Sequence, residues 1–457
     1  MPHPMTTHLR EHARLILDAA VAAADARSAV SRALRLEGES LRIVGAGDVL
    51  ERVHLPSTEN VWLIGAGKAA CAMAAGALDV LGDRVTGGTV TTKDGHGRDL
   101  PGIYVWEAAH PVPDTRGMAG AADALRMARA AGRRDLVLVL LSGGASALWA
   151  APAAGLALGD LRTVTDQLLR AGATIHEMNA VRKHLSRIGG GKLARAAAPA
   201  HVVTLAVSDV VGSELAVIGS GPAVPDYTTF ADALDVLERY GIQAPPAVRA
   251  HLRAGDAGEV EETVSLGDPA FARASAHVVA SNADALAGAS RAAQRLGYLT
   301  RIVADDVEGE ARGVGEQVAT LVRDTLAERP GMPVALLLGG ETTVTVTGTG
   351  RGGRNQELAL SVAMEIEGMD GVVVASLGTD GTDGPTDAAG GFADGGTVAR
   401  GHDAGLDARE ALRRNDAYPF LRAAGDLIVT GPTGTNVNDV VLVLIDPSVA
   451  LGEERTG

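Results

Sequence analysis

Short apolar runs alternate along this chain with longer segments whose apolar residues recur at helical spacing. In the first half, the runs that predict strands are "NVWLIGAG", "GGTVTTK", "IYVWEAAH", "DLVLVLLSGG" and "HVVTLAVSD". Most of these runs are continuously apolar, which is typical of strands buried on both faces of a parallel sheet. Between the last two, residues 156–188 have helical periodicity. The order of strand, helix and strand predicts an α/β fold.

A second pattern of strands and helices follows a polar, helical stretch that begins near residue 230. Its predicted strands are "AHVVASN", "YLTRIVADD", "VALLLGGE", "TTVTVTG" and "GVVVASLGTDG", and the end, "GDLIVTGPTGTNVNDVVLVLI", predicts two strands around a loop. The passage "GIQAPPAVRAHLRAGDAGEVEETV" is predicted to connect two domains. Because 457 residues exceed what one core usually serves, we predict α/β domains over 1–255 and 256–457. Each is expected to hold a mostly parallel sheet covered by helices, with an active-site cleft between them.

Charge and composition narrow the class of partner. The chain has 41 basic and 56 acidic side chains, a net charge of −15, and only 3% aromatic residues. Nucleic-acid binding needs a basic face, and single strands also need stacking rings, so we expect no nucleic-acid partner. An anionic small molecule is compatible with this charge if a few Lys and Arg side chains focus positive potential.

Cysteine usage and apolar run lengths indicate the compartment. The chain has a single cysteine, Cys71, which excludes an intrachain disulfide and suits a reducing cytoplasm. No apolar run approaches the roughly 18 residues of a spanning helix. The N-terminal stretch has scattered charges and predicts an amphipathic helix rather than a signal peptide. We therefore expect a cytoplasmic protein with no membrane partner.

Glycine-rich turns follow several predicted strands, where parallel sheets collect their binding groups. In "LIGAGKAA", Gly65 and Gly67 would let backbone amides approach an anion at a helix start, and Lys68 favours phosphate or carboxylate. The spacing also fits a loose dinucleotide fingerprint with Asp94 as ribose partner, and no Walker A motif is present. A tight turn with a solvated lysine is the alternative.

A serine-glycine turn follows the next buried strand. In "LLSGGASAL", Ser142 and Ser146 are placed to donate hydrogen bonds to phosphate oxygens, alongside the amides of Gly143 and Gly144. A turn with a helix cap explains the same residues nearly as well.

A basic helix leads into the following strand. In "HEMNAVRKHLSRIGGGKLA", Asn179 and Arg182 lie on neighbouring turns. Such a face is usually solvated, but the next strand ends at Asp209, where a Mg²⁺ ligand or a base would lie. That position favours a functional role for the helix.

Two loops in the second half carry charges among glycines. In "LGTDGTDGPTDAAGG", Asp380 and Asp383 suit Mg²⁺ shared with substrate phosphates, or else form Asx turns. In "GGETTVTVTGTGRGGRNQELAL", Arg351 or Arg354 can clamp a carboxylate or phosphate with two parallel hydrogen bonds. Asn355 and the free amides of the following helix would add donors.

Together these stretches resemble the bacterial and animal glycerate 2-kinases of the MOFRL type. The matching segments are "GAGKAA", "HPVPD", "LLSGGASAL", "NAVRKHLS", "SDVVGSELAVIGSGPAVPD", "GGETTVTVTGTGRGGRNQELAL", "LGTDGTDGPTDAAGG" and "GPTGTNVNDV", in order over both halves. The resemblance implies ATP-dependent phosphorylation of D-glycerate at its 2-hydroxyl, with Mg²⁺, in a two-domain α/β fold. It also implies that Lys68 and Arg354 carry the greatest catalytic weight. The chain departs from the family pattern at Ala145 and Ser213, which would affect the nucleotide pocket or the metal shell.

The motifs yield one set of predicted site residues. These are Lys68, Arg354 and Asp209 as catalytic groups, Asp380 and Asp383 as metal ligands, and Gly65, Gly67, Ser142, Gly143, Gly144, Ser146, Asn179, Arg182, Glu341, Asn355 and Asn436 as substrate or nucleotide contacts. The expected small molecules are glycerate and ATP with Mg²⁺, and the chain is compatible with a homodimer. Two other hypotheses remain: an NAD(P)H-dependent reductase of hydroxypyruvate or tartronate semialdehyde, and a non-catalytic sensor of sugar acids or nucleotides.

Overall fold

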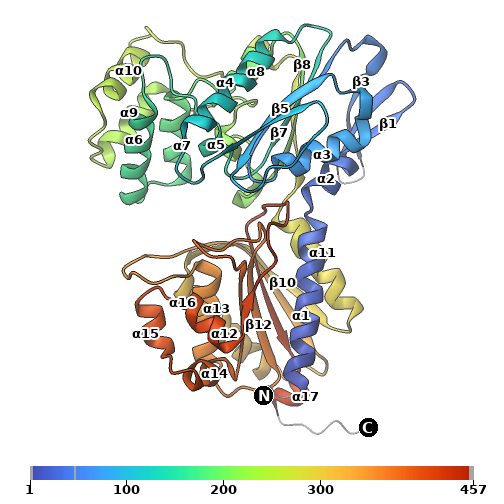
Figure 1. The fold of residues 1–457 in the computed structure, drawn as a ribbon, viewed down its shortest axis with the longest axis vertical. Helices are drawn as coiled ribbons and strands as arrows, with labels where there is room; N and C mark the ends of the chain where they lie inside the picture. Colours follow the sequence, from blue (N-terminus) through green and yellow to red (C-terminus); the bar gives the residue numbers. More distant parts are fainter. Residues whose placement is uncertain (1–3, 46–47, 452–457) are drawn as a thin grey trace. The chain divides into compact units, whose positions relative to one another are not determined.

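The computed structural model of the chain describes residues 4–45 and 48–451 and divides into two compact units (Figure 1). The first unit comprises residues 26–280, and the second combines residues 4–25 with residues 281–451. The division after residue 280 differs from the predicted one after residue 255. The reason is that the strand at 274–280, predicted to open the second domain, pairs with the sheet of the first unit.

Six parallel strands form the main sheet of the first unit, in the order β6-β5-β4-β7-β8-β9. Their bounds are β4 Val61–Ala66, β5 Gly87–Lys93, β6 Ile103–Ala108, β7 Leu136–Leu141, β8 His201–Val207 and β9 Ala274–Ala280. The chain starts in the middle at β4, moves outward through β5 and β6, and returns to β7 beside β4. The carboxyl ends of β4 and β7 therefore form a topological switch point, where open α/β sheets bind their ligands.

Helices cover this sheet and also form a separate helical cluster. The helices of the first unit are α2 Ala26–Ala33, α3 Ala70–Leu81, α4 Thr115–Ala130, α5 Ala145–Leu148, α6 Leu158–Arg170, α7 Ile175–His184, α8 Lys192–Ala197, α9 Phe230–Arg239 and α10 Pro246–Asp256. On one face of the sheet, Ile64 and Val139 share a core with Leu125 of α4 and Leu193 of α8. Helices α6, α7, α9 and α10 enclose a second core around Phe230. The passage predicted to connect the domains therefore contains α10 and belongs to the first unit.

A three-stranded antiparallel sheet completes the first unit. Its strands are β1 Leu34–Glu37, β2 Ser40–Gly45 and β3 Asp48–His54, in sequential order. It packs near β8 and β9 through Glu51, which accepts hydrogen bonds from Nε2 of His201 on β8 at 2.5 Å and from Oγ of Ser275 on β9. This small sheet lies on the route from α2 to β4 and contributes none of the predicted site residues.

The sheet of the second unit is mostly antiparallel, so the prediction of a mostly parallel sheet is wrong here. Its order is β10-β11-β15-β12-β13-β14, and only β10 and β11 pair in parallel. The bounds are β10 Leu299–Glu310, β11 Val334–Thr343, β12 Val372–Gly378, β13 Gly390–Asp394, β14 Leu427–Ile428 and β15 Asp439–Ile445. The cause is β15, which inserts between β11 and β12 and runs opposite to both.

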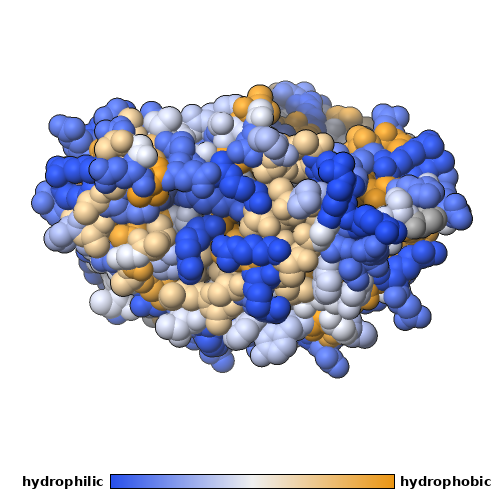
Figure 2. All heavy atoms as spheres, turned by 90° about the horizontal axis from the view of Figure 1, so that it is seen from above, coloured by the Kyte–Doolittle hydropathy of each residue, from blue (hydrophilic) through white to orange (hydrophobic). Residues whose placement is uncertain are grey.

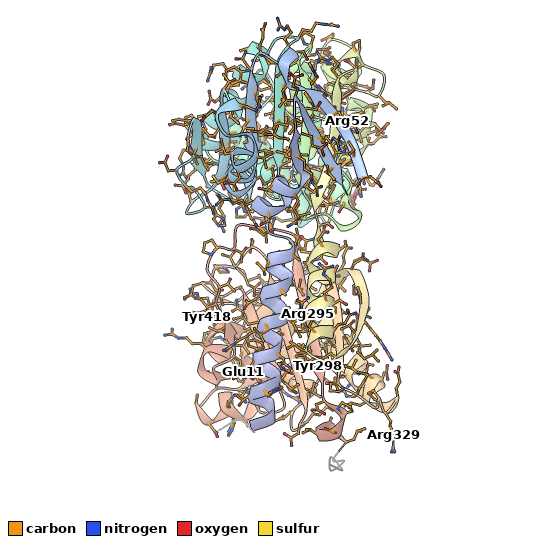
Figure 3. All side chains as sticks on the ribbon, turned by 90° about the vertical axis from the view of Figure 1, so that its right-hand side faces the viewer. Glu11, Arg52, Arg295, Tyr298, Arg329 and Tyr418 are labelled. Carbon is orange, nitrogen blue, oxygen red and sulfur yellow. The ribbon has the colours of Figure 1, made fainter. Side chains whose placement is uncertain are left out.

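The first helix of the chain belongs to the second unit. The helices of that unit are α1 Pro4–Ala23, α11 Asn282–Arg295, α12 Ala311–Ala327, α13 Arg354–Glu365, α14 Thr397–Asp403, α15 Ala408–Arg413, α16 Ala417–Ala424 and α17 Pro447–Ala450. Helix α1 lies along α11 (Figure 3) and buries Leu9, Ile16 and Leu17. Arg10 forms ion pairs with the buried carboxylates of Asp394 and Asp426, so α1 is anchored by charge as well as by apolar packing.

The surface is predominantly polar on the face seen in Figure 2, where hydrophilic side chains are interspersed with smaller apolar patches. Within residues 4–45 and 48–451, no helix has both the length and the apolar character needed to cross a membrane. The predicted amphipathic N-terminal helix is confirmed as α1.

Candidate functional site

The loops that follow β4 and β7 lie directly against each other at the switch point. The amide of Lys68 donates to the carbonyl of Gly143 at 2.9 Å, and the amide of Ala69 donates to Oγ of Ser142 at 3.0 Å. A Cβ on Gly67, whose φ is +130°, would lie 2.1 Å from that same Oγ. Only glycine fits there, and the tight turn brings half-buried Lys68 to the carboxyl edge of the sheet.

The backbone amides of the β4–α3 turn are used within the protein. Besides the bonds of Lys68 and Ala69, the amide of Gly67 donates to Thr91 at 3.1 Å and that of Ala70 to Gly67 at 3.1 Å. The prediction that this turn cradles an anion with its own amides is therefore wrong. What the turn offers a ligand is the side chain of Lys68.

The turn after β7 has the opposite character. In the part of the chain that the structure describes, the amides of Gly143 and Gly144 make no hydrogen bond to the protein. Gly144 has φ +86°, a left-handed conformation that favours glycine. Two adjacent amide donors without acceptors form the kind of concavity that binds phosphate or carboxylate.

Helix α7 reaches the same turn through a chain of hydroxyl hydrogen bonds. Oγ of Ser146 lies 2.9 Å from Oγ of Ser220, which donates to Oδ1 of buried Asn179 at 2.8 Å. The other end of the Asn179 amide donates to Val217 at 3.4 Å. Asn179 and Ser146 are thus committed to fixing the loop, and they support the site rather than presenting free groups.

Arg182, one helical turn beyond Asn179, is a cation without a counter-charge. It is half-buried, and among the described residues it makes neither a hydrogen bond nor an ion pair. Its neighbour Lys183 is instead paired with buried Asp226 at 2.9 Å. Burial lowers the pKa of Arg182. Since an uncompensated, partly desolvated charge is unfavourable, Arg182 suits an anion that is bound only transiently.

The remaining predicted residues of the first unit lie near this edge. Asp209 is half-buried immediately after β8, and Gly65 is buried at the end of β4. Ala145, where the family resemblance leads us to expect glycine, is buried in the sheet core, and a Cβ on Gly219 would lie 3.1 Å from its methyl group. The extra methyl group of Ala145 is therefore packed in the core of the first unit, close to Gly219. Ser213, where an acid was expected, has φ +53° in a left-handed turn.

One residue that the sequence analysis did not single out lies in this cluster. A Cβ placed on Gly144 would be 3.0 Å from both Cδ2 and Nε2 of His110 and 3.5 Å from Cγ of Lys68. The only signal in the sequence was the segment "HPVPD", quoted for resemblance and not for chemistry.

In the second unit, Arg354 is held by two carboxylates. Its Nε and Nη2 donate to the two oxygens of Asp439 at 2.6 and 2.9 Å, and Nη1 lies 2.8 Å from Glu341. Burial alone would lower the pKa of Arg354, but these carboxylates raise it well above its ordinary value. Asp439, not predicted, opens β15 and pairs in register with Gly340 and Gly378, so it lies at the carboxyl ends of β11 and β12.

Asp383 caps helix α13 instead of facing a metal. Its two oxygens accept from the amides of Asn355 and Gln356 at 3.2 and 2.9 Å, and from Nε2 of Gln356 at 3.0 Å. Oδ1 of Asn355 accepts from Ser376 at 2.6 Å. The predicted free amides and free Asn355 donors are therefore already occupied by the protein's own carboxylate. Burial and the charge of Asp439 raise the pKa of Asp383 to about 6.

Asp380 supports the alternative interpretation of the aspartate loop. Its Oδ1 accepts from the amide and hydroxyl of Thr382 at 2.9 and 3.0 Å, which is Asx-turn geometry. Asn436 is buried in the facing loop, where Thr433 donates to the carbonyl of Thr379 at 2.5 Å. Among the residues described, no three His, Cys, Asp or Glu side chains converge as a metal site. Asp380 and Asp383 therefore belong to no such cluster, and their role as ligands of a Mg²⁺ shared with substrate phosphates stays a prediction.

The second arginine of the glycine-rich loop has a structural position. The guanidinium of Arg351 lies 4.5 Å from the ring centroid of Tyr418 and donates through Nε to Pro385 at 3.3 Å. Its backbone amide donates to Asp416 at 2.8 Å. Of the two predicted anion clamps, only Arg354 lies among the carboxylates at the strand ends.

A cavity of about 460 Å³ lies elsewhere in the first unit. It is lined by Trp62, Tyr104 and Trp106 of the sheet and by Asp123 and Arg126 of α4. Because Trp62 is the second residue of β4 and Lys68 follows its end, this cavity is distant along the strands from the switch point.

Known proteins resemble the chain over nearly its whole length. The family described as "Domain of unknown function (DUF4147)" matches residues 12–253, and the MOFRL family matches residues 334–439. Glycerate 2-kinase from Pyrococcus horikoshii is 42% identical, with 96% of this chain and 97% of that protein covered. D-glycerate 2-kinase from Thermotoga maritima is 42% identical, covering 87% and 93%. A crystal structure of glycerate kinase from Thermotoga maritima matches with TM-score 0.81 and 38% identity, covering 96% and 100%.

Proposed function

This chain belongs to the family of glycerate kinases that combine a DUF4147 domain with a MOFRL domain, and from that premise we propose that it transfers a phosphoryl group from ATP to the 2-hydroxyl of D-glycerate. The observation that carries the proposal is the anion site at the switch point. Among the described residues, two amides without acceptors and the side chain of Lys68 lie at one edge of the first unit. Arg182 lies on α7, whose Asn179 is linked to the same turn through Ser220 and Ser146. Phosphoryl transfer asks a protein chiefly for such positioning and charge stabilisation.

In the proposed mechanism, Gly143 and Gly144 hold phosphate oxygens, and Lys68 neutralises charge on the group being transferred. Arg354 is fixed by Asp439 and Glu341, so its remaining guanidinium protons face a predetermined direction and would bind the carboxylate or phosphoryl oxygens. Mg²⁺ enters with ATP as part of the substrate, because it commonly binds through substrate phosphates and water.

The geometry argues against the reductase. Asp94, the ribose partner that a dinucleotide site would need, is bound by both terminal nitrogens of Arg116 at 2.6 and 2.8 Å. The amides of the β4–α3 turn, which would approach a pyrophosphate, are used internally. A sensor would use the anion site but would give no product.

One assay separates these functions. Protein is mixed with D-glycerate, ATP and Mg²⁺ and ADP is followed, while NADH with hydroxypyruvate is followed in parallel. ADP formation with 2-phosphoglycerate as product supports the proposal. NADH consumption alone identifies a reductase, and silence in both with saturable ligand binding identifies a sensor. Formation of 3-phosphoglycerate would refute the assigned hydroxyl.

Removal of the Lys68 ammonium tests the mechanism within this assay. We expect Lys68→Ala to lose at least ~10²-fold in kcat/KM, because removal of one charge-stabilising group typically has this effect. Thermal unfolding of the variant is the control for folding. A folded Lys68→Ala enzyme with near wild-type turnover would remove Lys68 from the mechanism.

A further inference from the structure

The imidazole of His110 borders the anion site but has no role in the mechanism so far. The 3.0 Å separation of Nε2 and Cδ2 from the Cβ position of Gly144 places the ring edge that carries Nε2 against the turn with the two available amides. Lys68 approaches the same position at 3.5 Å through Cγ. His110 is half-buried.

The segment that carries His110 is held on both sides. The amide of Ala109 donates to Oδ2 of Asp114 at 3.3 Å, and Oδ1 of Asp114 caps α4 by accepting from Gly117 at 3.0 Å. Arg162 of α6 donates through Nε to the carbonyl of Pro113 at 2.8 Å. Helices α4 and α6 therefore fix the backbone that carries the His110 ring, and a catalytic side chain requires such fixed positioning.

Gly144 is the position that permits the ring to lie there. A side chain at Gly144 would face the imidazole at a distance tighter than ordinary contacts, in a left-handed conformation that side chains rarely adopt. Glycine at this position thus leaves room for His110 as well as presenting its amide. Loop and histidine form one structural unit.

We propose that His110 is a catalytic residue: the general base that accepts the proton of the glycerate 2-hydroxyl through Nε2. This rests on the proposed kinase function. The hydroxyl oxygen forms a bond to the γ-phosphorus of ATP, the bond from that phosphorus to the bridging oxygen breaks, and ADP leaves. The hydroxyl proton passes to Nε2 and then to solvent.

Location favours His110 over the other candidate base, Asp209. A hydroxyl that attacks a phosphoryl group held by Gly143, Gly144 and Lys68 lies beside those groups, where Nε2 already is. Asp209 follows β8, one strand beyond β7. Imidazole also exchanges protons near neutral pH, whereas a carboxylate is a weaker base there.

The test compares four purified full-length enzymes: wild type, His110→Ala, His110→Gln and, as a matched control on the exposed β3 strand, His54→Ala. Glycerate phosphorylation is measured with and without added imidazole. We expect His110→Ala to lose 10²–10⁴-fold in kcat, the usual contribution of a general base, while KM for ATP changes little. Added imidazole should restore His110→Ala saturably, and it should not change His54→Ala.

Each outcome either supports or overturns the role of His110 as the general base. Glutamine keeps a hydrogen-bond donor of similar reach but cannot take a proton, so His110→Gln is expected to be as slow as His110→Ala. A fast His110→Gln enzyme would show that only a hydrogen bond is needed and would overturn the base. Loss of activity without imidazole rescue, in folded protein, would also overturn it. If wild type itself gives no phosphoglycerate, the kinase proposal fails rather than the assignment of His110.

Discussion

The two units use positive charge in opposite ways. In the first unit, Arg182 has no counter-charge, and the amides of Gly143 and Gly144 have no acceptor within the described chain. In the second unit, Arg354 is held by Asp439 and Glu341, and the amides that begin α13 are capped by Asp383. The donors of the first unit are therefore available to a ligand, whereas those of the second are occupied within the folded protein.

This difference separates binding from positioning. Unsatisfied donors are unfavourable in the folded protein and become favourable when an anion arrives, so they favour binding. A guanidinium fixed by two carboxylates gains rigidity, while the carboxylates offset its positive charge in the surroundings. Loss of Arg182 in the first unit should therefore change activity alone, and loss of Arg354 in the second should change activity and stability together.

The largest expected effect is at Arg354. Arg354→Ala should lose at least ~10²-fold in kcat/KM through loss of a charge-stabilising group. It should also lower the free energy of unfolding by about 2–4 kcal/mol, because Asp439 is left as a buried carboxylate without its main partner. Glycerate phosphorylation and urea unfolding measure the two effects.

A second substitution separates the two effects at this site. The double variant Arg354→Ala/Asp439→Asn removes the buried charge and should recover most of the stability but none of the activity. If Arg354→Ala is inactive yet as stable as wild type, the ion pair contributes nothing to the fold and the contrast between the units fails.

An intermediate effect is expected at Arg182. Arg182→Met should raise KM for an anionic substrate by about tenfold, the equivalent of about 1.4 kcal/mol of binding. Stability should be unchanged or higher, because an uncompensated, half-buried charge is replaced by an apolar chain. Arg187→Met, which removes an exposed cation just beyond the same helix, is the control. A marked loss of stability in Arg182→Met would mean that its charge is structural.

The smallest change in activity, within about threefold, is expected at Asp383 because it acts only as a helix cap. Its pKa in the folded protein, about 6, is above the ordinary 3.8. Its contribution to stability is therefore fully present below pH 4 and is lost as the pH rises through about 6. The unfolding free energy of wild type minus that of Asp383→Asn should fall over this window, by roughly 1–3 kcal/mol. A difference that rises with pH would show that the carboxylate is stabilised by its burial site.

Local pattern predicted the elements well and their long-range pairing poorly. Strands β4, β7 and β8 lie where continuous apolar runs placed them, because burial on both faces leaves a direct trace in sequence. The antiparallel sheet of the second unit was missed because β15 lies between β11 and β12, two strands that precede it in the chain. Apolar spacing carries no information about such insertions.

The sequence pattern predicted which loops form the site, but not which hydrogen bonds those loops make. Gly67, Gly143 and Lys68 do meet, because parallel strand ends share an edge. Asp439 was missed because its position beside Gly340 depends on the register of β15. His110 was missed because its approach to Gly144 joins two loops that are separate in the sequence. Which amides are available to a ligand was likewise decided by bonds between loops, such as that from Lys68 to Gly143.

Helix α1 has a consequence for how the polypeptide matures. Its partners Asp394 and Asp426 are translated long after it, with the whole of residues 26–280 in between. At a translation rate of about 5–20 residues per second, synthesis of that interval takes roughly 13–50 s. During this time the apolar face of α1 has no partner from the second unit. The apolar face of α1 is thus exposed until α11 and the rest of the second unit emerge to enclose it.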